Sequence, residues 1–285
     1  MIPAPSPGQG DDKIISVRNL RFTYEGGVVA ITDLSIDIRK GDYVALVGGN
    51  GSGKTTFAKN LNGLLRPCSG IVTIRGRDAA RTAVPELAKI VGYAFQNPDY
   101  QLFCATVEEE VRFGPLNLGY SEDDIRRKVE RALDAMNLQH LRDKPPLSLR
   151  LGERRRVSIA SVIAMDPDIF ILDEPTTGLD TEESDMLMQK LQNLNVEGKT
   201  IILITHDMRL VSEHAKRVVV MSVGRIILDS DPRGAFSDLE ILRRSNLEPP
   251  AVTKLAHALK DKGIPADVIS PQELVFHLLR GGESR

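Results

Sequence analysis

The residues Gly48-Gly-Asn-Gly-Ser-Gly-Lys-Thr55 decide the fold of this 285-residue chain. They satisfy the pattern G-x-x-x-x-G-K-[ST] and lie between an apolar run, Tyr43–Val47, and a segment of helical character, Lys54–Leu65. A buried strand, a glycine-rich turn and a helix in this order form a phosphate-binding loop, because the glycines let backbone N–H groups point inward around the phosphates. A chance glycine-rich turn would not need these flanking elements, so we predict a nucleotide site.

Two side chains of this loop have specific tasks in phosphate chemistry. Lys54 would reach the β- and γ-phosphates, and the hydroxyl of Thr55 would bind Mg²⁺. The N-terminus of the helix that follows adds a positive potential that favours an anion.

An acidic pair follows a second buried strand. The run Ile169–Leu172 is apolar throughout and leads directly into Asp173 and Glu174. A carboxylate at the end of a buried strand beside the phosphate loop is suited to bind Mg²⁺, which we assign to Asp173. Glu174 points the other way along the strand and would polarise the attacking water. A lone Asp-Glu pair is more often a solvated turn, but the apolar strand before it argues against that interpretation.

Two further polar residues end strands of the same kind. His206 follows the apolar run Thr200–Ile204 and would sense the γ-phosphate by a hydrogen bond, with a capping or surface histidine as the alternative. Gln96 follows the run Val91–Phe95 and would touch Mg²⁺ or water, although a glutamine by itself is not a specific signal.

The remaining segments alternate between strands and helices. Strand-like runs occupy 14–20, 28–38, 71–75, 218–221 and 225–228, and helical runs occupy 121–135, 153–164 and 182–194. Apolar strands that alternate with helices predict a parallel sheet covered on both faces. The helical block at about 97–165 interrupts this pattern and is expected to form a separate lobe. After Asp231, helices at 252–260 and 271–279 and a strand at Asp267–Ile269 predict a small α/β appendage.

Bulk composition excludes several classes of protein. The chain has 37 Lys and Arg against 39 Asp and Glu and no Trp, which argues against a nucleic-acid-binding protein. Cys68 and Cys104 have no metal-like or CxxC spacing and are expected to be reduced. No apolar run approaches the roughly 20 residues that span a bilayer. Residues 1–13 lack an apolar signal core and are expected to form a flexible leader.

These elements, in this order, resemble the ATP-binding-cassette (ABC) ATPase family, and the resemblance covers residues from about 14 to 230. It implies an α/β fold with a P-loop NTPase (RecA-like) core, an antiparallel β subdomain and a helical subdomain. The nucleotide-binding domain would span 14–232, and 233–285 would form a small C-terminal α/β domain that pairs subunits.

The resemblance also implies roles for individual residues. Gln96 would be the Q-loop glutamine that touches Mg²⁺, His206 the switch histidine and Asp180 the D-loop aspartate near the nucleotide. Tyr24 lies 24 residues before Gly48, where the family places an aromatic that stacks on adenine, but Tyr24 is equally suited to be a core aromatic of a strand. The implied ATP contacts of the Walker A loop are Gly48, Asn50, Gly51, Ser52, Gly53, Lys54, Thr55 and Thr56.

A narrower resemblance is carried by Phe95-Gln-Asn-Pro-Asp-Tyr-Gln-Leu-Phe103, by Thr106–Leu118 and by Glu248–Ala256. These segments are similar to the energy-coupling-factor (ECF) transporter ATPases, which drive uptake of vitamins or of cobalt and nickel ions. The resemblance implies three partners: a second ATPase subunit, a transmembrane coupling subunit that docks near Gln96–Phe103 and, indirectly, a substrate-binding membrane subunit. It places the protein peripherally on the cytoplasmic face of the cell membrane.

One motif departs from the family pattern. Where the family has Leu-Ser-Gly-Gly-Gln/Glu, a gapless alignment gives Leu149-Arg-Leu-Gly-Glu153, so that Arg150 replaces the signature serine and Leu151 replaces the first glycine. Ser148 is an alternative signature serine, but it would displace the helix start by more than half a turn. In the family this serine donates to the γ-phosphate bound on the opposite subunit. Arg150 and Gly152 would therefore contact the partner's ATP.

The substitutions change the chemistry offered to the partner. Arg is a poor N-cap, and the β-carbon of Leu151 hinders close backbone approach to a phosphate. A guanidinium can nevertheless pair with phosphate in a bidentate way. We hypothesise an intact site in this subunit (Lys54, Glu174 and His206) and a degenerate contribution to the partner, as in a heterodimer. A homodimer that tolerates the change, or an engineered change, are the alternatives.

Two rival functions stay open at the level of sequence. One is a soluble ABC-type protein that acts on ribosomes or DNA, although such proteins usually carry two fused cassettes or a long coiled-coil insertion. The other is a regulatory nucleotide binder that does not hydrolyse ATP, against which an intact Glu174 and His206 count. A soluble ABC-type regulatory ATPase that is not coupled to transport is the alternative to an importer subunit. The transported solute is not encoded in these motifs.

Overall fold

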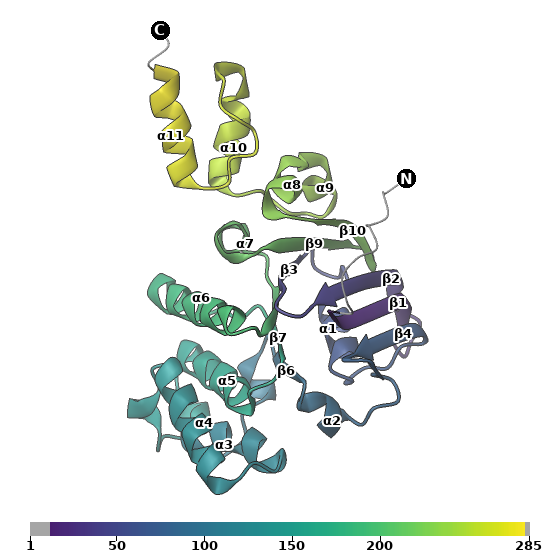
Figure 1. The fold of residues 1–285 in the computed structure, drawn as a ribbon, viewed down its shortest axis with the longest axis vertical. Coiled ribbons are helices and arrows are strands. Elements are labelled where there is room, and N and C mark those ends of the chain that lie inside the picture. The colour runs from purple at the N-terminus through teal and green to yellow at the C-terminus, as the bar shows by residue number, and fades with distance from the viewer. Residues whose placement is uncertain (1–11, 283–285) are drawn as a thin grey trace.

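A six-stranded sheet forms the centre of the molecule (Figure 1). The computed structural model describes residues 12–282. The strand order is β10-β9-β3-β8-β7-β6, and all neighbours are parallel except β10, which is antiparallel to β9. Every residue of β3, β7 and β8 is buried, because both faces of the sheet are covered. The strands are β3 (Tyr43–Val47), β6 (Val91–Ala94), β7 (Ile169–Asp173), β8 (Thr200–Ile204), β9 (Arg217–Ser222) and β10 (Arg225–Ser230).

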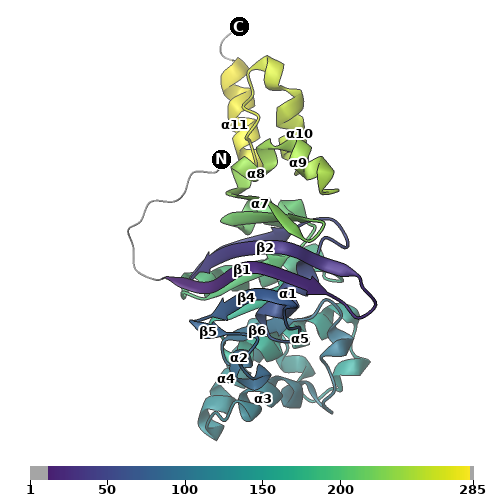
Figure 2. The same ribbon diagram turned by 90° about the vertical axis from the view of Figure 1, so that its right-hand side faces the viewer.

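A second, antiparallel sheet covers one face of the first, and Figure 2 shows it toward the viewer. Its order is β2-β1-β4-β5, built from β1 (Lys13–Thr23), β2 (Val29–Arg39), β4 (Ser69–Ile74) and β5 (Arg77–Asp78). Apolar side chains of both sheets and of α1 (Lys54–Leu61) form one buried cluster, in which Leu34 and Ile171 are completely buried. This cluster fixes α1, and with it the phosphate loop, between the sheets.

A helical lobe lies at the opposite side of the central sheet. It consists of α3 (Val107–Asn117), α4 (Glu122–Ala135) and α5 (Leu151–Met165), and it shares a buried cluster with α6 (Thr181–Val196) and with strands β7 and β8. Side chains one turn apart on α4, Ile125, Val129 and Leu133, face this cluster, while its acidic first turn lies at the helix N-terminus. The hydroxyl of Ser121 caps α4 by accepting from Asp124 N at 3.2 Å, as the sequence predicts.

The last two helices, α10 (Ala251–Ala258) and α11 (Pro271–Gly282), stand away from the core (Figure 1). Before them, α7 (Met208–His214), α8 (Pro232–Ser237) and α9 (Leu239–Arg244) share a buried cluster with strands β3 and β9. α10 and α11 bury a small cluster of their own that includes Ala256, Val268 and Leu274. Within residues 12–282 no helix combines the length and apolarity needed to cross a membrane.

The predicted core of alternating strands and helices is confirmed, and two local predictions are wrong. No strand forms at Asp267–Ile269, so the described C-terminal appendage is helical rather than α/β. The carbonyl of Val268 instead accepts the hydroxyl of Thr253 at 2.9 Å, and its side chain packs among helices. The helix predicted over Lys54–Leu65 ends at Leu61, because Gly63 adopts a left-handed conformation (φ 77°).

The predicted leader, residues 1–13, lies outside the described residues except for its last two. Short 3₁₀ turns at Pro98–Tyr100, Gln139–Leu141, Pro146–Ser148 and Lys260–Lys262 and a five-residue helix α2 (Val84–Ala88) complete the elements.

Candidate active site

A cavity of about 350 Å³ opens at the carboxyl edge of the central sheet. It gathers residues from the phosphate loop, from the β1–β2 connection and from the ends of β6 and β7, which are distant in sequence. The carboxyl ends of parallel strands are where α/β proteins bind ligands. The lining residues that the sequence singled out are Tyr24, Asn50, Gly51, Ser52, Gly53, Lys54, Thr55, Thr56, Gln96, Asp173 and Glu174.

Two glycines of the loop are required by its geometry. Gly48 has a φ of 150°, and a β-carbon there would lie 2.2 Å from the carbonyl oxygen of Met221. Gly53 has a φ of 102°, and a β-carbon there would lie 2.6 Å from the carbonyl oxygen of Ala30. Any larger residue would push the loop off the sheet, so these glycines keep the backbone N–H groups around the cavity.

Lys54 begins α1 with its ammonium folded over the loop. Its Nζ donates to the carbonyl oxygens of Gly48 and Gly49 at 2.8 and 3.0 Å and to Ser52 Oγ at 3.3 Å. Burial lowers the pKa of Lys54, and the carboxylates of Glu174 and Asp173 act in the opposite direction. A cation held by three neutral acceptors at a helix N-terminus is well placed to exchange them for phosphate oxygens.

The carboxylate of Asp173 accepts hydrogen bonds from two hydroxyl groups. Its Oδ2 accepts from Thr55 Oγ1 at 2.8 Å and from Tyr93 OH at 3.0 Å. Burial, together with the neighbouring charge of Asp173, raises the pKa of Tyr93, so its phenol stays protonated and donating. Carboxylate and hydroxyl oxygens are the ligands that Mg²⁺ prefers, so the pair Thr55 and Asp173 fits this ion.

Glu174 and His206 form a second pair across the strand ends. His206 Nδ1 and Glu174 Oε1 are 2.8 Å apart. The side chain of Glu174 is 12% exposed and that of His206 is 74% exposed. Glu174 has a left-handed backbone (φ 48°), which is costly for a non-glycine residue and is frequent at functional sites. Its N–H donates to Ile204 O at 2.9 Å and thereby ties this conformation to β8.

Tyr24 and Gln96 also line the cavity. Tyr24 OH is 2.9 Å from Thr56 Oγ1, and its ring packs edge-on against Phe22 with centroids 4.9 Å apart. The ring thus combines core packing with a 39% exposed face beside the loop. The backbone carbonyl oxygen of Gln96 accepts a hydrogen bond from the guanidinium of Arg155.

Five predicted residues do not line this cavity. Gly48 and His206 border it through the loop and through Glu174, and the other three lie beside one another. Arg150 precedes α5, Gly152 is in its first turn, and Asp180 precedes α6. A β-carbon on Gly152 would lie 3.0 Å from Gly178 O, so the start of α5 packs directly on the 178–180 loop. The carboxylate of Asp180 caps α6 by accepting from Glu183 N at 2.8 Å.

The first turn of α5 is poorly capped. Arg150 N–H donates to Glu153 Oε2 at 2.9 Å, but an arginine side chain has no acceptor to return the bond. The side chain of Leu151 covers Gly178, whose β-carbon position lies 2.8 Å from Leu151 Cδ2. Ser148, the alternative signature residue, ends a 3₁₀ turn and donates its hydroxyl to Pro145 O at 2.7 Å.

Sequence reasoning missed two residues of the site. Tyr93 reaches Asp173 across 80 positions, and Arg155 reaches Gln96 across 59. Neither belongs to a short motif. The only sequence signal is that Tyr93 has a polar tip in an otherwise apolar strand that ends beside Gln96.

A phosphate loop on a parallel sheet, an Asp that meets the loop threonine and a Glu–His pair one residue further on define a P-loop ATPase of the cassette type. The chain belongs to the ABC transporter family, whose model matches residues 31–177.

Relatives narrow this class. The chain is 40% identical over 266 residues to the energy-coupling factor transporter ATP-binding protein EcfA2 of Methanospirillum hungatei, which covers 93% of this chain and 67% of that protein. It is 41% identical to EcfA of Methanocaldococcus jannaschii, covering 87% of this chain and 90% of that protein. Some relatives are longer: the chain spans 44% of a putative ABC transporter ATP-binding protein of Caldanaerobacter subterraneus.

Solved structures agree with this assignment. The structure of cbiO1 from Clostridium perfringens, described as part of the ABC transporter complex cbiONQ, has a TM-score of 0.72 and 38% identity and covers 88% of this chain and 100% of that chain. A dimeric ATP-binding cassette in a post-hydrolysis state with ADP and Pi has a TM-score of 0.71 and 27% identity, over 77% of this chain and 99% of that chain.

Proposed function

We propose that the chain is the ATP-binding and ATP-hydrolysing subunit of an ECF-type importer that energises uptake of a micronutrient, either a cobalt or nickel ion or a vitamin. The observation that carries the proposal is the Glu174–His206 pair, 2.8 Å apart, at the edge of the phosphate cavity. The relatives named above, with the names that they carry, support the transport role.

The residues divide the work of hydrolysis as follows. Lys54 exchanges its loop carbonyls for the β- and γ-phosphate oxygens of ATP. Mg²⁺, which Thr55, Asp173 and Gln96 would hold, supplies neutralisation of phosphate charge. Glu174 accepts a proton from the attacking water, and the hydrogen bond from His206 Nδ1 orients its carboxylate. Tyr24 offers its partly exposed ring to the adenine.

An apolar groove between the core and the helical lobe is the proposed docking surface for the transmembrane coupling subunit. The groove has a volume of about 250 Å³ and is lined mainly by apolar side chains. Phe103 and Phe113 are 62% and 44% exposed and stack edge-on with centroids 4.7 Å apart. Exposed aromatic pairs of this kind mark interaction sites. Gln101 and Phe103 of the segment Gln96–Phe103 line the groove. The substrate-binding membrane subunit would be contacted indirectly.

A second ATPase subunit, in a homo- or heterodimer, would complete the assembly. Pairing would bring Arg150, Gly152 and Asp180 against the partner's ATP, and Arg150 would replace a serine hydroxyl there with a charged fork. Residues 14–232 would be the nucleotide-binding domain and 233–285 a pairing domain. The protein would sit peripherally on the cytoplasmic face of the cell membrane and bind no nucleic acid.

Copurification tests the transport role. We expect the tagged chain, extracted from its own cells in mild detergent, to bring down a polytopic membrane protein. Phe103→Asp should break this association, because it charges the proposed groove, while ATP binding stays unchanged. Val196→Asp, a change at an exposed site on α6, is the control. A chain that carries no membrane protein, or a Phe103→Asp chain that keeps it, contradicts the proposal and favours a soluble regulatory ATPase.

A further inference from the structure

A buried cation beside the cavity has no task in the chemistry described above. Arg155 lies on α5 and is 2% exposed. Its NH1 donates to Phe95 O at 2.7 Å, and its NH2 donates to Gln96 O. One guanidinium therefore holds two consecutive carbonyl groups of the segment that carries Gln96.

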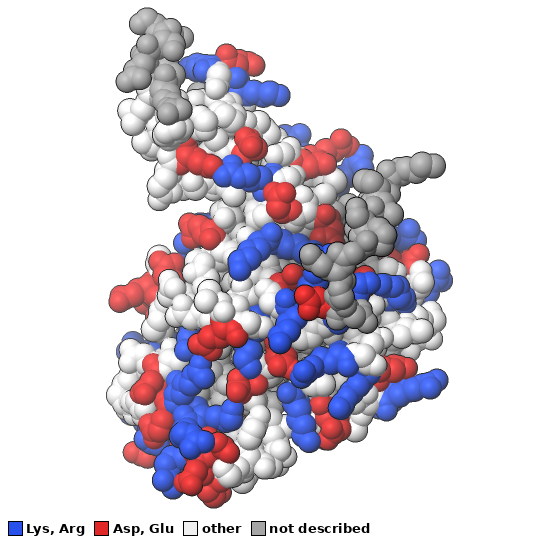
Figure 3. All heavy atoms as spheres, viewed as in Figure 1, with Lys and Arg blue, Asp and Glu red and all other residues white. Residues whose placement is uncertain are grey.

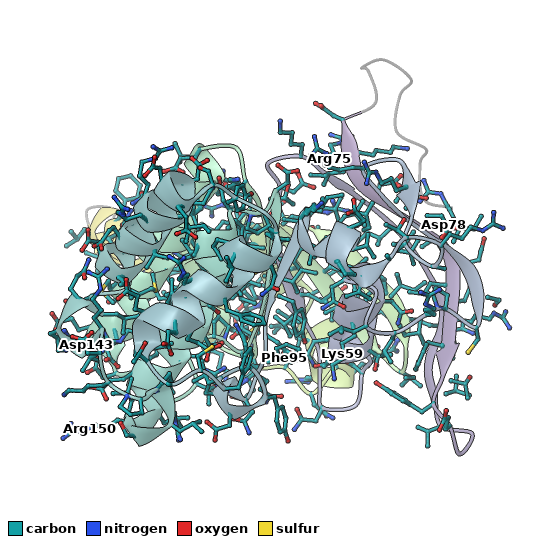
Figure 4. The ribbon with its side chains drawn as sticks, turned by 90° about the horizontal axis from the view of Figure 1, so that it is seen from below. Lys59, Arg75, Asp78, Phe95, Asp143 and Arg150 are labelled. Atoms are coloured by element: carbon teal, nitrogen blue, oxygen red, sulfur yellow. The ribbon has the colours of Figure 1, made fainter. Side chains whose placement is uncertain are left out.

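The rest of this segment is also attached to α5. Gln101 Nε2 donates to Ser158 O and to Ser161 Oγ, both at 2.8 Å, and Ser158 Oγ donates to Gln101 Oε1 at 2.8 Å. Arg154 forms a looser ion pair with Asp99 at 3.4 Å. Residues 95–101 are thus fastened to the helical lobe, whereas β6 just before them pairs with β7 in the central sheet. Figure 4 shows Phe95 at this junction and Arg150 at the outer end of the lobe.

The charge of Arg155 is costly where it lies. Burial lowers its pKa, and the carboxylates of Asp173 and Glu174 in the cavity are the main counterweights. None of the 25 ion pairs found among residues 12–282 includes Arg155, and its Nε is buried without a hydrogen-bond partner. A cation held mainly by backbone carbonyls is sensitive to small displacements, because it has no carboxylate to retain it when they move.

We propose that Arg155 is a positioning residue for ATP hydrolysis, which holds the backbone of Gln96 so that its side chain stays on the cavity rim. This inference rests on the proposed function and adds a connection between the first turn of α5 and Gln96. The first turn of α5 carries Arg150–Gly152, and Arg155 lies one turn further along the same helix. A shift of α5 produced at its N-terminus is passed directly to Gln96.

The test compares substitutions at Arg155 in the complete detergent-extracted complex. Arg155→Gln keeps one hydrogen-bond donor group but loses the fork, and Arg155→Lys keeps the charge. We expect kcat for ATP hydrolysis to fall about 10- to 100-fold in Arg155→Gln, the scale of loss that small misplacement causes. The Mg²⁺ concentration for half-maximal rate should rise, and ATP affinity measured without Mg²⁺ should stay within about twofold. The kcat of Arg155→Lys should lie between that of Arg155→Gln and that of the unaltered chain.

Two controls separate positioning from folding. Arg154→Gln, at the neighbouring position, should leave kcat within about twofold, because Arg154 touches Asp99 and not Gln96. A double-mutant cycle is the second control. In a chain that already carries Gln96→Ala, adding Arg155→Gln should lower kcat little further, because both changes act on the same contact. The inference is overturned if the effects of Arg155→Gln and Gln96→Ala on kcat multiply independently. It is also overturned if Arg155→Gln leaves both kcat and the Mg²⁺ dependence unchanged. Absence of hydrolysis in the unaltered complex would instead refute the proposed function.

Discussion

At the scale of single residues, the decisive feature is the contrast between two groups of side chains. At the sheet edge, Thr55 pairs with Asp173 and His206 with Glu174, and Lys54 donates to the carbonyl groups of the loop. Arg150 and Leu151, by contrast, stand at the N-terminus of α5, away from the cavity, where the family has a serine and a glycine. From this separation we expect intact chemistry in this chain, and we propose that it offers altered chemistry to a partner.

Restoring the family residues tests the second half of that statement. In Arg150→Ser with Leu151→Gly, we expect the assembled complex to hydrolyse ATP faster. The reason is that a serine hydroxyl would then replace the guanidinium of Arg150, which positions the phosphate of the partner's ATP differently. A restored N-cap should also stabilise α5 by about 0.5–2 kcal/mol, offset in part by the added glycine. Steady-state ATPase and transport rates measure the first effect.

The control for this prediction is Ser148→Ala. Because Ser148 bonds only to Pro145 O in its own turn, its removal should leave hydrolysis unchanged. Unchanged ATPase and transport rates in the restored variant would sink the idea of a degenerate contribution, and a loss of activity in Ser148→Ala would show that the motif is in the other register.

The sequence predicts most of the site because its residues occur in short motifs. Seven residues that line the cavity, 50–56, are consecutive in the sequence, and Asp173 and Glu174 are adjacent. Tyr93 and Arg155 could not be predicted, since their contacts join segments 80 and about 60 residues apart. Such contacts depend on tertiary packing, which a periodic pattern does not encode. The wrong strand at Asp267–Ile269 has a similar cause, because a strand requires a neighbour to pair with.

At the scale of elements, an ion-pair network ties the helical lobe together. Arg142 donates to Glu108 Oε1 at 2.8 Å and Oε2 through its NH2 and Nε, and it also pairs with Glu130 of α4. Figure 3 shows side chains of both signs mixed over this part of the surface. The hydrogen bond from Arg142 holds the pKa of Glu108 below its ordinary value of 4.5.

This network predicts a pH-dependent stability. A carboxylate with a lowered pKa stabilises the folded state above its unfolded pKa, and the contribution is lost as the pH falls through the lowered value. Glu108→Gln should therefore lower the free energy of unfolding at pH 7 by about 0.5 kcal/mol, a modest amount because the pair is partly exposed. The difference in the free energy of unfolding between Glu108→Gln and the unaltered chain should decrease below pH 4.5. Urea unfolding at several pH values measures it.

A matched change outside the lobe is the control. Glu240→Gln removes an exposed i,i+4 partner of Arg244 on α9 and should leave the lobe unaffected. A difference between Glu108→Gln and the unaltered chain that grows in acid would contradict the assigned direction of the Glu108 pKa.

At the scale of the whole molecule, helices α10 and α11 bury a small apolar cluster and also expose several large apolar side chains. On α11, Val275 and Leu279 are 53% and 69% exposed, and on α10 Leu255 is 48% exposed. This surface stands clear of the core (Figure 1), so the core cannot cover it. Together with the notion of a pairing domain at 233–285, it predicts burial against a second subunit.

Charging this surface should weaken subunit pairing. Val275→Glu with Leu279→Glu is expected to shift the mass measured by light scattering toward the monomer, or to raise the dissociation constant of the pair, because a carboxylate is costly in an apolar interface. Val196→Glu, at an 85% exposed site of α6, should have no effect. Unchanged pairing in the double variant would show that the C-terminal helices are not the pairing surface.

The central claim is that this chain hydrolyses ATP in its own site with Glu174 as the base. The most direct measurement follows a photoreactive ATP bound to the complete complex and determines, on this chain alone, the fraction converted to ADP in a single turnover. We predict conversion on the unaltered chain and, in Glu174→Gln, a rate lower by about 100-fold or more with ATP still bound. Conversion in Glu174→Gln at the unaltered rate, or none in the unaltered chain, would contradict the claim.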